Sequence, residues 1–188
     1  QDCCLLLEVT EGSLFAESHR AAATYLGPPG PVYFRFAREK TPVITTAETP
    51  FEIGKAEIFA EYGRDVAIIA CGPLVYQSLV AAKELESEGV RVTVVNNHTV
   101  KPMDKDCVLR QAQNCGAVVT VEEHQIMGGM GSAVAEVLAQ NYPVPMEFVG
   151  MQNVFGESGQ PDELLEKYGM SVGAIKEAVK RAVKRKNL

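Results

Sequence analysis

Hydrophobic positions follow two alternating patterns from about residue 64 to the C-terminus. Residues 66–70 form an unbroken apolar run, which is typical of a strand buried on both faces of a sheet. Apolar residues then recur with a helical period to about Glu88, and Gly89 ends that helix. The same alternation predicts strands at 90–95, 117–121 and 145–149 and helices at 104–115, 128–138, 161–168 and 172–183. The pattern predicts an α/β fold, with a mainly parallel sheet and helices on both faces in a Rossmann-like three-layer arrangement.

The first third of the chain lacks this alternation. A short helix is predicted at 18–26, a Gly/Pro-rich turn ends it, and a β-branched and aromatic strand follows at 32–36. Residues 39–52 contain Pro42, Pro50 and three threonines, which favour an extended linker. The predicted division is a remnant of a preceding domain at 1–38 (with 1–17 unassigned), a linker at 39–63 and a complete α/β domain at 64–188.

Charge and hydropathy exclude two classes of partner. The chain has 188 residues, with 18 Lys and Arg against 24 Asp and Glu, and its net charge is −6. This balance argues against a general nucleic-acid binder, which needs a basic surface for phosphates. Basic residues cluster only at 176–186, where they are expected to form a solvated helix face. No apolar run approaches the roughly 18 residues of a spanning helix, so a membrane span is not expected.

Cysteine and histidine usage indicates a reduced environment. The five cysteines, at positions 3, 4, 71, 107 and 115, form no CxxC pair, and no secretory signal is recognised at the start. We therefore expect a cytoplasmic protein in which the last three are small core residues. Three widely spread histidines give no zinc-ligand pattern, and no metal site is expected. His98 is expected to be a hydrogen-bonded loop residue.

Glu122, Glu123 and His124 stand at the carboxyl end of the third predicted strand of the α/β domain, where ligand sites of open α/β sheets gather. A carboxylate and an imidazole there could serve acid–base chemistry. No nucleophile or second base stands nearby in the sequence, so a polar strand end or a contact with a partner subunit is favoured.

Gly128 and Gly129, with Met130 and Gly131, open the following helix. Backbone amides at a helix start can hold a phosphate. The spacing is neither GxGxxG after a first strand nor a P-loop, so close packing of the helix on the sheet is the favoured interpretation.

Two further candidates lie at the ends of other predicted elements. Arg38 follows a strand, where its guanidinium could bind a phosphate or a carboxylate, or form a surface salt bridge. Glu157 and Ser158 lie between two glycines in a tight turn, where they could cap a helix or contact a neighbouring subunit. The order of these residues is not the G-x-S-x-G of a hydrolase.

Several of these motifs, taken together and in order, resemble the transketolase family. Residues 30–40 resemble the end of its pyrimidine-binding domain, and residues 51–56 resemble the linker that follows. Segments similar to its C-terminal domain are 99–104, 121–124, 128–131 and 155–159. The resemblance is closest to the C-terminal section of the split, two-gene bacterial type, so 64–188 is expected to be a transketolase C-terminal domain.

The resemblance implies a part of an enzyme rather than a whole one. The family transfers a two-carbon ketol unit between sugar phosphates in the pentose phosphate pathway, with thiamine diphosphate and a divalent metal such as magnesium. By this resemblance the chain lacks the diphosphate-binding section and most of the pyrimidine-binding domain, so it holds no catalytic or cofactor-binding residue and is inactive alone. Arg38 occupies the motif position of the arginine that contacts the substrate phosphate. Expected partners are the N-terminal diphosphate-binding section and a second copy, in a homodimer through the C-terminal domain.

Three alternatives stay open. 1-Deoxyxylulose-5-phosphate synthases are expected to carry Pro-Arg-Gly where this chain has Ala37, Arg38 and Glu39. The E1 β subunits of 2-oxoacid dehydrogenases share the glycine-rich helix start but not the region of Arg38. The third alternative is a stand-alone module that binds a phosphorylated ligand at the helix start of residues 128–131.

Overall fold

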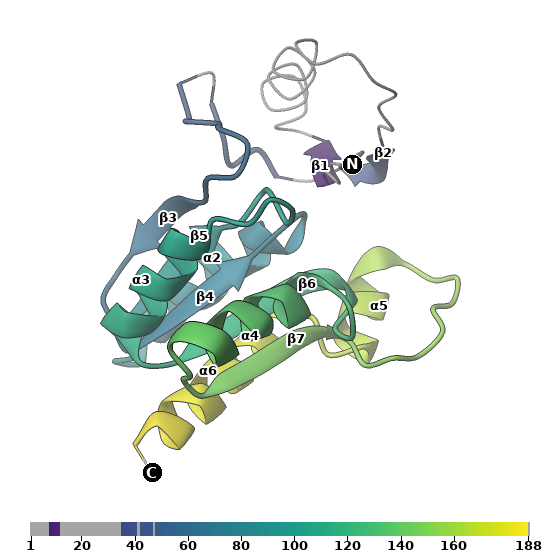
Figure 1. Ribbon diagram of the computed structural model, residues 1–188. Coiled ribbons are helices and arrows are strands. Elements are labelled where there is room, and N and C mark those ends of the chain that lie inside the picture. The colour runs from purple at the N-terminus through teal and green to yellow at the C-terminus, as the bar shows by residue number, and fades with distance from the viewer. Residues whose placement is uncertain (1–7, 12–34, 41, 47, 188) are drawn as a thin grey trace.

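The structure is a computed structural model that describes residues 8–11, 35–40, 42–46 and 48–187, with side chains from residue 42 onward (Figure 1). Its main body is a five-stranded sheet in the order β3-β5-β4-β6-β7. The strands are β3 (Glu57–Glu61), β4 (Val66–Ala70), β5 (Val92–Asn96), β6 (Val118–Gln125) and β7 (Met146–Met151). The last four are parallel to one another, and β3 pairs antiparallel with β5 at the edge.

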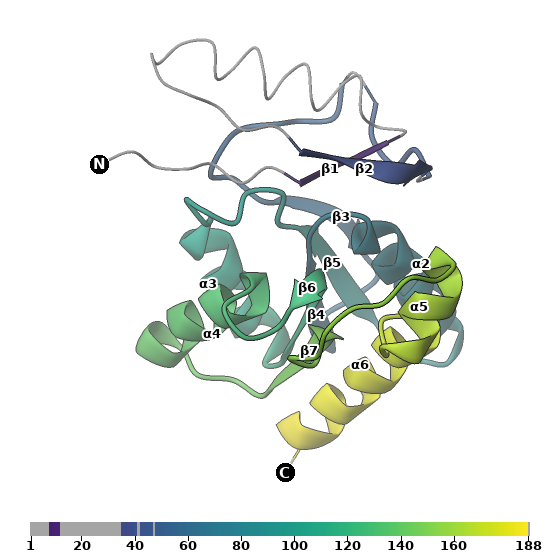
Figure 2. The same cartoon turned by 90° about the vertical axis from the view of Figure 1, so that its right-hand side faces the viewer.

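Helices cover both faces of this sheet, as Figure 2 shows with the strands between two helical layers. They are α2 (Leu74–Ser87), α3 (Lys105–Cys115), α4 (Met130–Asn141), α5 (Pro161–Lys167) and α6 (Val172–Lys186). One hydrophobic cluster joins α2 and α6 to the sheet, and a second joins α3 and α4 to the opposite face. The fold class expected from the sequence is confirmed.

The four parallel strands form where the apolar runs predicted them. Every residue of β4 and β5 is buried, because both strands lie inside the sheet and are covered on both faces. The crossover from β4 to β5 runs through α2, and the next crossover passes through α3 to β6 on the other side of β4. The chain therefore reverses its direction of winding between β4 and β6, and ligand sites of such sheets lie at the carboxyl ends of the strands there.

The predicted linker at 39–63 contains an unexpected element, the edge strand β3. Two of its five residues, Glu57 and Glu61, carry charge, and its burial is only partial. An edge strand of this kind shows no continuous apolar run, which explains why the hydrophobic pattern missed it.

The N-terminal part contains a two-stranded parallel pair, β1 (Glu8–Glu11) with β2 (Arg35–Lys40). The sequence analysis left β1 unassigned. It expected a strand at 32–36, whose start lies outside the described residues, and β2 continues this strand to Lys40. The helix expected at 18–26 lies wholly outside the described part of the chain.

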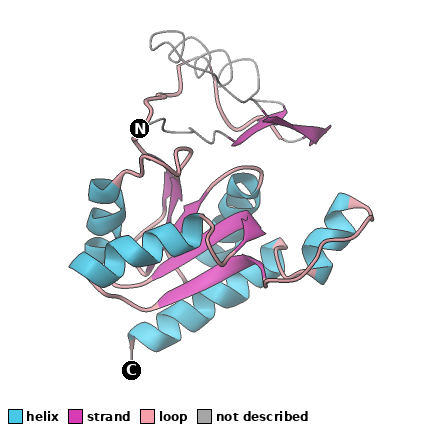
Figure 3. Cartoon of the chain, turned by 45° about the vertical axis from the view of Figure 1, so that its right-hand side comes forward, coloured by secondary structure: helices cyan, strands magenta, loops and turns pink. Residues whose placement is uncertain are grey.

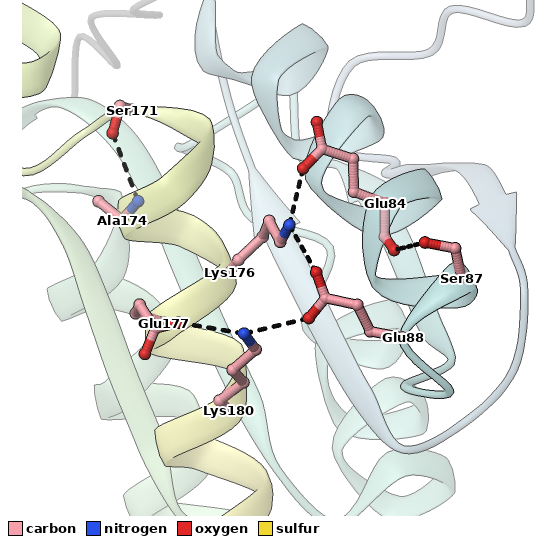
Figure 4. A network of polar contacts seen from close by, with 8 residues as sticks. All are labelled: Glu84, Ser87, Glu88, Ser171, Ala174, Lys176, Glu177 and Lys180. Carbon is pink, nitrogen blue, oxygen red and sulfur yellow. Dashed lines mark hydrogen bonds and ion pairs between the residues drawn. The ribbon is translucent and has the colours of Figure 1, made fainter.

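Helix α6 is joined to α2 by ion pairs, which Figure 4 shows from close by. Lys176 Nζ lies 2.7 Å from a carboxylate oxygen of Glu84 and 2.7 Å from one of Glu88. Lys180 Nζ lies 3.1 Å from the other oxygen of Glu88. The basic cluster expected to be only a solvated face is therefore also a contact surface between two helices. Figure 3 shows α5 set apart from the main helical layers, between two loops.

The cysteine expectation is confirmed for the described cysteines, since Cys71, Cys107 and Cys115 are buried and form no disulfide. Burial raises the pKa of the Cys107 and Cys115 thiols. No helix among the described residues is long and apolar enough to cross a membrane.

Candidate functional site at the carboxyl edge of the sheet

Glu122, near the end of β6, is 2% exposed and binds the start of α4. Its two carboxylate oxygens accept hydrogen bonds from the Met130 amide at 2.7 Å and the Gly131 amide at 2.8 Å. The first amides of a helix lack intrahelical acceptors and carry the positive end of the helix dipole. The buried carboxylate therefore caps α4 and ties it to the sheet.

Two glycines allow this close approach. A Cβ on Gly129 would overlap the Glu122 carboxylate and the Gln125 carbonyl oxygen. A Cβ on Gly131 would lie 2.6 Å from Thr120 Oγ1. The packing interpretation of the glycine-rich helix start is thus supported, and the carboxylate that already occupies its amides argues against a phosphate there.

The structure separates the acidic and histidine residues that the sequence places in a row. Glu122 is buried against α4, whereas Glu123 and His124 are exposed. Successive side chains of a strand point to opposite faces of the sheet. The side chains of Glu122 and Glu123, neighbours on β6, therefore point in opposite directions. Glu122 therefore holds α4 against the sheet, whereas Glu123 and His124 take no part in this contact.

The loop after β7, residues 152–160, is held in place by polar contacts. Gln125 Nε2 donates to the Val154 carbonyl oxygen at 2.7 Å. Tyr168 Oη donates to Glu157 Oε1 at 3.0 Å, and Lys167 forms an ion pair with the same carboxylate. These contacts lower the pKa of Glu157, with the Lys167 bond as the largest cause.

The capping interpretation of Glu157 and Ser158 is wrong. Helix α5 begins at Pro161 with Gln160 as its N-cap residue, and the Gln160 side chain makes no capping hydrogen bond. Glu157 instead connects the loop to α5 through its contacts with Lys167 and Tyr168, and Ser158 is exposed.

Despite these contacts, the two loops at this edge present apolar side chains to solvent. Phe155 is 99% exposed, Met127 is 68% exposed and Val154 is 45% exposed. We call these three residues the edge patch. Nothing in the hydrophobic pattern distinguished them, because isolated apolar residues in loops are common. Exposed apolar patches, unlike single residues, mark interaction sites, and the hydrogen bond from Gln125 to Val154 joins the two loops that carry these side chains.

A second cluster joins the linker to the loop before α3. The Phe51 ring stacks on His98 with centroids 4.5 Å apart. Gly54 N–H donates to Thr99 Oγ1 at 3.3 Å, and Ala56 N–H donates to Asp104 Oδ2 at 3.0 Å. We call these contacts between residues 51–56 and 98–104 the linker dock. The two segments are separate motifs in the sequence, and the structure brings them together.

Asp104 belongs to both the linker dock and α3. Its Oδ1 accepts from the Cys107 amide at 3.0 Å, which makes Asp104 the N-cap residue of α3, at the start of the helix that the sequence predicts over 104–115. Burial favours a higher pKa for this carboxyl, but the hydrogen bonds from Cys107 and Ala56 and the charges of Lys55 and Arg110 lower it overall. A pocket of about 480 Å³ lies beside it, bordered among others by Phe51, Lys55 and Arg110.

His98 is a hydrogen-bonded loop residue, as expected. Its Nδ1 lies 3.0 Å from Thr99 Oγ1, while Nε2 is buried and has no hydrogen-bond partner among the described residues. Burial lowers the pKa of the ring. Below the ordinary histidine pKa of about 6.5, the unfolded chain therefore binds this proton more readily than the folded chain does.

This difference predicts that stability falls as the pH drops below about 6.5 and is fully present above it. We expect the free energy of unfolding to be lower at roughly pH 5.5 than at pH 7.5, with this group as one cause. Urea unfolding at both pH values measures it. His98→Gln should remove this part of the dependence, and the exposed His124→Gln should retain it. An unchanged dependence in His98→Gln would contradict the assignment.

Arg38 lies on β2, and its side chain is outside the described part of the structure. Its role in binding phosphate stays a prediction. Within the described residues, no three histidine, cysteine, aspartate or glutamate side chains come together as ligands for a metal ion.

Comparisons with known proteins show which family and which enzymes this chain is similar to. Residues 54–175 match the family described as transketolase, C-terminal domain. The chain is 43% identical over 172 residues to the 6-deoxy-6-sulfo-D-fructose transketolase subunit SqwH of Clostridium sp. strain MSTE9, covering 92% of this chain and 53% of that subunit. It is 39% identical over 159 residues to a putative transketolase C-terminal section of Methanocaldococcus jannaschii, covering 83% of this chain and 49% of that protein.

Similarity extends to a second enzyme and to a solved structure. The 1-deoxy-D-xylulose-5-phosphate synthase of Trichormus variabilis is 41% identical over 157 residues, covering 81% of this chain and 25% of that enzyme. A structure titled split gene transketolase, inactive β4 tetramer superposes with a TM-score of 0.87 at 39% identity, covering 97% of this chain and 58% of that chain. The chain thus spans about half the length of the two transketolase relatives it matches.

Proposed function

The chain belongs to the transketolase C-terminal domain family, and we propose that it is the C-terminal part of a thiamine-diphosphate-dependent enzyme that transfers a two-carbon ketol unit between sugar phosphates. The match to a transketolase subunit and to a split-gene transketolase supports this assignment. In the proposed enzyme, an N-terminal section supplies the diphosphate site and the magnesium ligands. Thiamine diphosphate supplies the carbon nucleophile when bound, and this chain takes no chemical step.

The proposed division of the chain follows from this assignment. Residues 1–38 end a pyrimidine-binding domain that includes Arg38, residues 39–63 connect the domains, and residues 64–188 are the C-terminal domain. Strand β3, within the connecting segment, pairs with the sheet of the C-terminal domain. The linker therefore functions as part of that domain from residue 57 onward. We place the enzyme in the cytoplasm and in the pentose phosphate pathway.

The direct role proposed for the C-terminal domain is assembly of a homodimer. The observation that carries this role is Phe155, which is 99% exposed although its loop is held by contacts with Gln125 and α5. An ordered loop that presents an unpaired aromatic ring fits a surface that a second copy covers. The relative described as a β4 tetramer supports self-association in this family.

An activity assay tests the proposed enzyme. We expect no ketol transfer from this chain alone, and transfer between sugar phosphates once the intact subunit is combined with an N-terminal section, thiamine diphosphate and magnesium. Consumption of pyruvate with glyceraldehyde 3-phosphate would instead favour a 1-deoxyxylulose-5-phosphate synthase, for which 41% identity gives independent support. Transfer by this chain alone would overturn the proposal.

Substitution of Phe155 tests the assembly role. Phe155→Ser is expected to weaken self-association about 30-fold, because a central aromatic residue of an interface contributes about 2 kcal/mol or more. Sedimentation equilibrium measures this change in the dissociation constant. Tyr142→Ser is the matched control, since Tyr142 is an aromatic residue that is 41% exposed beyond the C-terminal end of α4. Equal association of wild type and Phe155→Ser would rule out the edge patch as the contact.

A further inference from the structure

The loop after β7 is fixed at its middle by Tyr168, the residue that follows α5. The ring of Tyr168 packs against the hydrophobic cluster of α2 and α6, so the body of the domain sets its position. Its Oη lies 3.4 Å from the carbonyl oxygen of Phe155 and 3.0 Å from Oε1 of Glu157. A side chain anchored in the domain therefore reaches the backbone of Phe155 directly.

Glu157 and Lys167 keep the Tyr168 hydroxyl in place. The hydroxyl has one proton to donate, and the Glu157 carboxylate, which is charged and nearer than the Phe155 carbonyl, is the stronger acceptor. Lys167 forms an ion pair with the same carboxylate, and its Nζ lies 5.9 Å from the centre of the Tyr168 ring. We call Glu157, Lys167 and Tyr168 the loop clasp. It holds the loop both at Phe155 and two residues beyond it.

Phe155 depends on backbone contacts of this kind for its position. Its ring is 99% exposed, so packing around the ring does not fix where it points. On one side, Gln125 Nε2 donates to the carbonyl oxygen of the preceding Val154 at 2.7 Å. On the other side, the loop clasp holds the chain. A loop that is ordered before a partner arrives avoids the free-energy cost of ordering it during binding.

We propose that Tyr168 is a positioning residue for Phe155: through the loop clasp it holds the edge patch in the arrangement that a second copy of this chain binds, and so sets the strength of self-association. The inference rests on the proposed assembly role, which gives Phe155 its contact with the second copy. Tyr168 does not touch the second copy in this scheme, and its hydroxyl acts only through the loop.

Tyr168→Phe tests this role with the smallest possible change. It removes the hydroxyl and keeps the ring that packs against the hydrophobic cluster. We expect the dissociation constant of self-association to rise about fivefold, because the loop must then be ordered during binding. Sedimentation equilibrium of the chain measures this change. Hydrogen exchange at residues 154–158 of the monomeric variant should be faster than in the monomeric wild type.

A double-mutant cycle separates positioning from a contribution to the domain as a whole. In the background of Phe155→Ser, adding Tyr168→Phe should change the dissociation constant by less than about 1.5-fold, since the side chain that the clasp positions is already gone. A further fivefold loss in that background would show that the hydroxyl acts elsewhere, and it would overturn the inference.

Tyr142→Phe is the matched control. It removes the same atom from an exposed tyrosine that follows α4, at the end of the helix opposite to the glycine-rich start. The dissociation constant should stay that of the wild type, and a loss equal to that of Tyr168→Phe would overturn the inference. Phe155→Ser keeps the two levels apart. If it leaves self-association unchanged, the proposed assembly role fails. If it weakens self-association while Tyr168→Phe does not, only the role of Tyr168 fails.

Discussion

Glu122→Ala is expected to lower the free energy of unfolding by about 3 kcal/mol, since hydrogen bonds to charged groups contribute roughly 1.5–3 kcal/mol each. The substitution leaves the amides of Met130 and Gly131 without their carboxylate at a buried helix start. It also removes negative charge from the positive end of the α4 dipole. Urea unfolding of the chain, with the slope compared between variants, measures the loss.

The neighbouring carboxylate provides the control for Glu122→Ala. Glu123→Ala removes the same charge from the same strand, but at an exposed side chain. It should change the free energy of unfolding by less than about 1 kcal/mol, as exposed charges contribute little. If the two variants lose equal stability, the cap on α4 does not stabilise the fold as described.

Gly131→Ala is expected to cost about 3 kcal/mol, the upper part of the usual range for overpacking a core. The added methyl would lie 2.6 Å from Thr120 Oγ1 and 2.9 Å from a ring carbon of Phe148. Both neighbours stand on strands of the sheet, so α4 must move away from it. That movement also lengthens the hydrogen bonds to Glu122. Thermal and urea unfolding both measure this loss.

Gly173→Ala is the matched substitution in another helix. A Cβ at Gly173 meets only Ser171 Oγ, at 3.8 Å, which is ordinary contact. Alanine there should stabilise α6 by up to about 1 kcal/mol through its higher helix propensity. A loss in Gly173→Ala as large as that in Gly131→Ala would mean that the close approach of α4 to β6 is not the cause.

The sequence predicts β4, β5 and the first part of β6 because burial on both faces demands continuous apolar residues. It does not predict β3, whose edge position leaves Glu57 and Glu61 compatible with a linker. Local chemistry predicts Asp104 as the cap of α3, yet its bond to Ala56 depends on where a distant segment folds.

The candidate site, like the fold, could be predicted only in part from the sequence. Glu122 and the Gly129 region are recognised as unusual from residue type and position. Their contact is not recognised, because nothing in the local sequence shows that a strand residue will face amides eight positions later. Phe155 has no periodic neighbours, so only its exposure in the folded chain marks it.

Helix α6 has a consequence for how the domain forms during synthesis. Its Ile175, Ala178, Val179 and Ala182 complete the cluster that covers one face of the sheet. Lys176 pairs with Glu84, 92 residues earlier. A nascent chain that has emerged only as far as β7 therefore carries an uncovered apolar sheet face beside α2. Transiently exposed apolar surface of this kind makes an incomplete chain prone to aggregation, so the domain is protected only after α6 has left the ribosome and packed on the sheet.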